Sequence, residues 1–121
     1  MARYVDGFVI AVPKKKVSAY LKMAKLGAKV WKEHGALEYY ECVGEDLKAQ
    51  FGMTSFPKLA QLEKGETVVF SWIVYRSKKH RDSVNAKVMK DPRMNDPELQ
   101  KNVPFDMKRM AYGGFETLVH W

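Results

Sequence analysis

The sequence has little cysteine and no long hydrophobic run. Cys42 is the only cysteine among 121 residues, so the chain can form no internal disulfide and no zinc or iron–sulfur site made of cysteines. No apolar stretch approaches the roughly 20 residues that cross a bilayer, and residues 1–12 lack the pattern of a signal peptide. We therefore expect a cytoplasmic protein that does not enter the membrane.

Motifs of the common catalytic classes are also missing. The chain contains no GxGxxG or Walker loop, no HExxH and no GxSxG, which argues against dinucleotide-binding, P-loop, zinc-protease and hydrolase classes. The three histidines, His34, His80 and His120, are far apart in sequence. We expect neither a metal site nor a cofactor.

The composition is that of an ordinary globular protein. With 46% hydrophobic and 29% charged residues, 121 residues suit one domain spanning 1–121. The net charge of +7 attracts anions, so nucleic acid, anionic membrane surfaces and small acidic metabolites all fit as partners.

The pattern of apolar residues predicts strand, helix, strand, strand, helix, strand. These elements cover residues 4–12, 17–34, 36–43, 67–75, 77–90 and 107–119. Asp96-Pro97 predicts a short helical turn, and residues 55–62 are expected to extend a strand. The order βαββαβ indicates an α+β, ferredoxin-like fold, in which a four-stranded antiparallel sheet carries two helices on one face.

The predicted sheet is apolar on both faces. In residues 67–75, Phe70 and Trp72 lie on one face while Val69 and Ile73 lie on the other. Two helices cover only one face, so we expect a second copy of the chain to cover the other and form a homodimer. The alternative is a monomer in which residues 55–62 fold over the open face.

Five segments carry a resemblance to a known family. They are YVDGFV (4–9), WKEHGALEYYEC (31–42), VVFSWIVY (68–75), HRDSVNAKVMKDPRM (80–94) and PFDMKRMAYGGFE (104–116). Together they resemble the YbaA-like family of uncharacterised bacterial proteins over nearly the whole chain. The resemblance implies the dimeric α/β-barrel superfamily, in which two sheets close into a barrel between subunits, and it implies no particular activity.

Three polar residues are candidates for a site. His34, at the end of the first helix, is a candidate general base, although a histidine there also fits a role at the helix C-terminus. Asp6 and Arg109 lie in strands predicted to be buried, so each needs a partner. They either form an ion pair across the sheet, which we favour, or hold a polar ligand.

Aromatic residues supply the other candidates. Tyr40 and Trp72, on strands expected to be neighbours, form either one wall of a ligand pocket or a core or dimer contact. Cys42 is expected to be a buried, unreactive thiol.

Three functions remain open at this point. The first is a homodimer that binds a small, largely apolar molecule between sheet and helices, with cofactor-independent chemistry like that of monooxygenases or isomerases. The second is a non-enzymatic binder of RNA or an anionic surface through a basic stripe on the first helix, at Lys22, Lys25, Lys29 and Lys32. The third is a structural dimer without a ligand.

Overall fold

The computed structural model describes residues 2–121 and contains one antiparallel sheet of four strands. The strands are β1 (Tyr4–Pro13), β2 (Glu38–Val43), β3 (Glu66–Tyr75) and β4 (Ala111–Glu116). Their order across the sheet is β2-β3-β1-β4, so the long apolar strands β1 and β3 are central and the two short strands form the edges. This arrangement confirms the predicted ferredoxin-like α+β fold.

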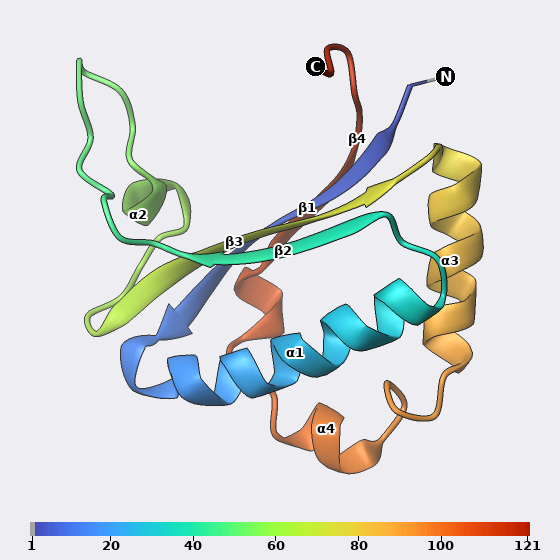
Figure 1. Cartoon of the computed structure of the whole chain (residues 1–121). Coiled ribbons are helices and arrows are strands. Elements are labelled where there is room, and N and C mark those ends of the chain that lie inside the picture. Colours follow the sequence, from blue (N-terminus) through green and yellow to red (C-terminus); the bar gives the residue numbers. More distant parts are fainter. Residues whose placement is uncertain (1) are drawn as a thin grey trace.

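The two long helices pack on one face of the sheet (Figure 1). A 3-10 turn (Lys14–Lys16) leads from β1 into α1 (Val17–Glu33), and α3 (Lys78–Lys90) follows β3. Ser77 caps α3, because its Oγ accepts a hydrogen bond from the backbone N–H of His80. The short helix α4 (Pro97–Lys101) begins after Asp96, as predicted, and lies beyond α1.

Alternation along the strands decides which side chains reach the helices. Phe8, Ile10 and Val12 of β1 pack against Tyr20 and Ala24 of α1. Ile73 and Tyr75 of β3 pack, farther along, with Val30 of α1 and with Val84 and Val88 of α3. The residues between these positions point to the opposite face, which we call the open face.

The segment 44–65 leaves the sheet between β2 and β3. Residues 55–62, which were predicted to extend a strand, instead contain α2 (Phe56–Leu59), a single helical turn capped by Ser55. Pro57 explains the difference, because proline fits the first turn of a helix and gives no N–H to a strand ladder. The segment lies on the open-face side, where the Phe56 ring is 5.8 Å from that of Phe70 (Figure 1).

The predicted last strand, 107–119, is longer than the observed one. Met107–Arg109 form a 3-10 turn, and only Ala111–Glu116 pair with β1. The pairing runs without a bulge, and Gly113 lies directly opposite Gly7. A side chain at Gly114 would collide with the Tyr4 ring, so this glycine permits a close approach.

Candidate functional site

A cavity of about 300 Å³ lies between the sheet and α1. Its remaining wall is the chain between α3 and β4, which includes α4. The lining is mainly apolar and contains four of the seven methionines, Met23, Met94, Met107 and Met110. Methionine is flexible and polarisable, so such a wall adapts to ligands of different shape.

One face of α1 is shaped to meet this cavity. The cavity is lined by four residues of α1 that are spaced three or four positions apart, Tyr20, Met23, Gly27 and Trp31. A Cβ at Gly27 would lie 2.8 Å from the Tyr39 hydroxyl, so the absence of a side chain lets that hydroxyl lie against the helix. Glycine inside a helix is about 1 kcal/mol less favourable than alanine, and this contact supplies a packing reason for it.

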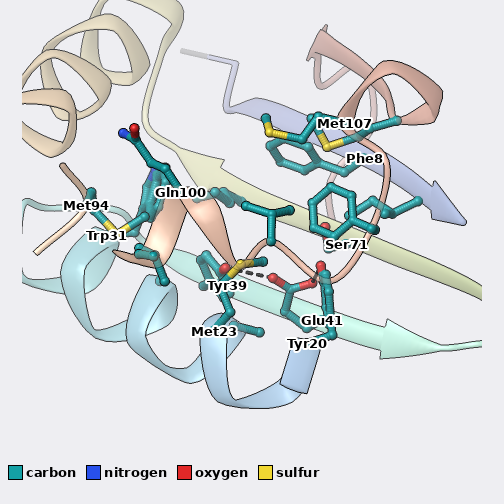
Figure 2. Close-up of a pocket in the computed structure, with 18 residues that line it drawn as sticks. Phe8, Tyr20, Met23, Trp31, Tyr39, Glu41, Ser71, Met94, Gln100 and Met107 are labelled. Carbon is teal, nitrogen blue, oxygen red and sulfur yellow. Dashed lines mark hydrogen bonds between the residues drawn. The ribbon is translucent and has the colours of Figure 1, made fainter. Parts of the chain in front are cut away.

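A single carboxylate forms the polar end of the cavity (Figure 2). The Tyr20 hydroxyl donates to Glu41 Oε1 and the Tyr39 hydroxyl donates to Glu41 Oε2, both at 2.7 Å. Burial, together with the negative charge of Glu41, raises the pKa of both tyrosines well above the usual value. The tyrosines are therefore neutral donors, and Glu41 accepts one hydrogen bond on each of its two carboxylate oxygens.

The position of Glu41 follows from alternation in β2. Tyr39 and Glu41 point toward α1, whereas Tyr40 and Cys42 point to the open face. Ser71 of β3 is the register partner of Glu41, and it is buried and also lines the cavity. This site combines an apolar chamber with one proton acceptor, and the sequence interpretation did not single out Glu41 for such a role.

His34 lies elsewhere. It is the C-cap residue of α1, and its Nε2 is 2.8 Å from Asp91 Oδ2. Asp91 also accepts from Arg93 at 2.7 Å, and these contacts, Arg93 first, hold the pKa of its carboxyl well below the usual range. The cluster ties the end of α1 to the end of α3, and His34 does not line the cavity.

The predicted pairing of Asp6 with Arg109 is wrong. Asp6, which is 1% exposed, accepts from Arg81 Nη1 at 2.6 Å and from the Tyr112 hydroxyl at 3.2 Å. Arg109 lies in the 3-10 turn and donates to both carboxylate oxygens of Glu66 at 2.7 Å. The two residues thus belong to separate structural ion pairs.

A buried hydrogen-bond network connects Asp6 to the cavity wall. The Asn85 amide donates to Asp6 Oδ2 at 3.4 Å, and Asn85 Oδ1 accepts from the Trp31 indole N–H at 3.1 Å. The same indole contacts the Tyr75 hydroxyl at 3.1 Å. Trp31 is therefore held in a fixed orientation beside the cavity.

Tyr40 and Trp72 are neighbours, as predicted, but they do not line the cavity between sheet and helices. They are register partners on β2 and β3, and their rings stack with centroids 4.7 Å apart. Both lie on the open face, where Trp72 borders a hollow together with Phe70 and Phe115. Cys42, on the same face, is exposed and not buried as expected.

Three further predictions concern the basic stripe of the first helix, metal binding and membrane-spanning helices. The stripe Lys22, Lys25, Lys29 and Lys32 is exposed on α1. Within residues 2–121 no group of three or more histidine, cysteine or acidic residues is placed to hold a metal ion. No helix in the same range has the length and apolar character needed to span a bilayer.

Comparison with known proteins identifies the family. A family model described as "Protein of unknown function (DUF1428)" matches residues 3–107. The chain belongs to this family. It is 49% identical to the uncharacterised protein YbaA of Escherichia coli K12 over 117 residues, which is 97% of each chain, and equally similar to YbaA of Shigella flexneri. The resemblance seen in the sequence is thereby confirmed.

Solved structures support the fold. A dimeric ferredoxin-like protein from an uncultured marine organism aligns with a TM-score of 0.62 at 10% identity, with all of both chains covered. A nipsnap family protein of unknown function from Agrobacterium tumefaciens aligns with a TM-score of 0.57 at 14% identity, over 95% of this chain and 87% of the other. At such low identity the likeness concerns the fold of the family and not its activity.

Proposed function

We propose that this protein is a homodimer of single-domain subunits, each of which binds a small, largely apolar molecule in the cavity between sheet and helices. The observation that carries the proposal is the apolar chamber of about 300 Å³ with Glu41 at one end. Ligand sites in proteins are typically concave, mostly apolar and supplied with a few polar groups that orient the ligand.

The volume limits the size of the ligand. A dry cavity of about 150 Å³ accommodates benzene, so a chamber of about 300 Å³ has room for about twelve non-hydrogen atoms. This corresponds to a two-ring compound. If the bound molecule also reacts without a cofactor, in the manner of isomerases or monooxygenases, the proton acceptor would be Glu41, because it is the only aspartate or glutamate among residues 2–121 that lines the chamber.

The exposed aromatic residues of the open face support the pairing of two subunits. Tyr40, Phe70 and Phe115 remain 44%, 43% and 60% exposed, although α2 covers one end of this face. Contiguous apolar surface of this kind marks interaction sites. The solved ferredoxin-like protein with the same fold is described as dimeric, which agrees with a second copy as the cover.

Sedimentation at micromolar concentration tests the pairing. We expect a particle of about 28 kDa, twice the 14.0 kDa of one chain. Phe115→Glu, on the open face, should give a folded monomer because a charge would be buried at the interface. Met89→Glu is the matched control, since Met89 is 61% exposed but lies on α3. A wild-type particle of 14.0 kDa would overturn the dimer.

Thermal unfolding with a panel of neutral one- and two-ring compounds tests the ligand site. A compound at a hundred times its Kd should stabilise the protein by about 2.7 kcal/mol. Val103→Trp, which fills the chamber, should abolish this effect, whereas Val119→Trp in the exposed C-terminal segment should not. If no compound stabilises wild type more than Val103→Trp, the proposed site is wrong.

A further inference from the structure

We infer that the ligand of this cavity carries a neutral or cationic hydrogen-bond donor that contacts Glu41, and that carboxylic acids of the same shape are rejected. The inference rests on the proposed function, because it assigns a chemical class to the molecule bound there. Three features of the cavity support it: the hydrogen bonds of Glu41, the charge of the lining, and the direction in which Tyr20 and Tyr39 donate.

Glu41 has acceptor capacity left for a ligand. An ionised carboxylate offers about four lone-pair sites on its two oxygens. Tyr20 occupies one site on Oε1 and Tyr39 one site on Oε2, each at 2.7 Å. Among the side chains of residues 2–121, only these two donate to Glu41, so at least one site on each oxygen remains for a donor from the ligand.

The lining contains no positive charge to receive an anion. Among residues 2–121, Glu41 is the only aspartate or glutamate of the lining, and no lysine, arginine or histidine lines the chamber. A ligand carboxylate would enter an apolar space beside another carboxyl group, that of Glu41, which offers acceptors and no positive charge, and the low local polarity strengthens repulsion between such groups. The cavity therefore has the opposite charge preference from the surface, whose net charge of +7 attracts anions.

The two tyrosines cannot easily exchange their present partner for an anionic ligand. Each hydroxyl has one proton, and each already donates it to Glu41. A ligand that needed a donor would have to take that proton from the Glu41 hydrogen bond and leave a buried carboxylate less satisfied. A ligand that supplies a donor adds to the arrangement without breaking it.

A matched series of naphthalene derivatives tests this preference. The probes are 1-methylnaphthalene, 1-naphthalenemethanol, 1-naphthylmethylamine and 1-naphthoate, which share one apolar body of the size estimated above. In calorimetric titrations of the full chain at pH 7, we expect the alcohol and the amine to bind at least tenfold more tightly than naphthoate. Equal or tighter binding of naphthoate would overturn the inference.

Substitution of Glu41 locates the cause. Glu41→Gln should reduce the ratio of amine to naphthoate affinity at least tenfold while leaving 1-methylnaphthalene binding unchanged. Glu38→Gln is the matched control, because Glu38 lies on the same strand and is exposed, and it should leave the ratio unchanged. An effect of Glu38→Gln equal to that of Glu41→Gln would refute the assignment.

The apolar probe separates two kinds of failure. If 1-methylnaphthalene binds to wild type and not to Val103→Trp, while amine and acid bind equally, the chamber binds ligands and only the assigned class is wrong. If none of the four probes binds, the proposed function fails together with this inference. If Glu41→Gln does not fold, the wild-type ratio of amine to naphthoate still decides the preference.

Discussion

The buried ion pair between Asp6 and Arg81 gives a prediction whose size follows from the structure. Arg81 contacts two carboxylates, Asp6 at 2.6 Å and Asp82 at 2.8 Å, but their surroundings differ. The Asp6 side chain is 2% exposed and that of Asp82 is 60% exposed. Replacing either by asparagine removes one charge beside the same guanidinium, but only Asp6 is buried and also accepts from Tyr112 and Asn85.

We expect Asp6→Asn to destabilise the protein by about 3 kcal/mol. Removing one partner of a buried ion pair typically costs about 3 to 5 kcal/mol, and the lower end applies because Arg81 keeps Asp82. Asp82→Asn should cost about 0.5 kcal/mol or less, since exposed pairs are weak. For a chain of this length, 3 kcal/mol corresponds to a fall in Tm of about 10 °C.

Urea unfolding followed by tryptophan fluorescence measures both variants. All proteins should be compared at one concentration, because the proposed pairing of subunits would make apparent stability depend on concentration. The burial argument is refuted if Asp6→Asn and Asp82→Asn lower the free energy of unfolding by the same amount. It is also refuted if Asp6→Asn costs less than about 1 kcal/mol.

Two further predictions concern acid stability and nucleic acid binding. The hydrogen bonds from Arg109 lower the pKa of Glu66 from its ordinary value of 4.5 to about 2, so this pair stabilises the fold above pH 4.5 and the contribution is lost as pH falls toward 2. The stability advantage of wild type over Glu66→Gln, measured by urea unfolding, should shrink over that range, and an advantage independent of pH would contradict this. If the protein instead binds RNA through α1, affinity for a short single-stranded RNA should fall steeply with salt, and the slope should shrink when glutamine replaces three lysines, Lys22, Lys25 and Lys29. Affinity independent of salt would exclude that role.

Much of the fold could be predicted because local signals agreed with the tertiary structure. The apolar pattern of residues 67–75 identified β3, Ser77 identified the start of α3, and Asp96-Pro97 identified α4. Residues 55–62 were misassigned because a single turn of helix has no periodicity to distinguish it from a short strand.

Pairing of charged residues could not be predicted in the same way. Asp6 and Arg109 were identified as residues that need partners, but sequence alone does not say which opposite charge folding brings near. Asp6 pairs with Arg81, which is 75 positions away on α3. In the sequence, Arg81 has the pattern typical of the solvent-exposed polar face of a helix. Arg109 reaches Glu66, the first residue of β3, because the chain makes a 3-10 turn before β4.

A cavity lies between sheet and helices, where a ligand site was predicted, but the predicted site residues do not line it. Trp72 and Tyr40 were predicted to form a pocket wall or a dimer contact because they are large aromatics on neighbouring strands, and alternation places them on the open face. Glu41 resembles a surface residue of an edge strand. Strand alternation could have indicated its position, because Glu41 lies two residues after Tyr39 and so shares a strand face with it. Gly27, a glycine inside α1, was a second indication that another element packs closely there.

Because the sheet is one backbone thick, adjacent residues of β2 and β3 serve different surfaces. Tyr40 and Trp72 face outward, while their sequence neighbours Glu41 and Ser71 face the chamber. Substitutions at alternate positions of the same strands would therefore change the proposed ligand preference and the proposed pairing of subunits separately during evolution. Members of the family could keep one way of assembling while they diverge in what they bind.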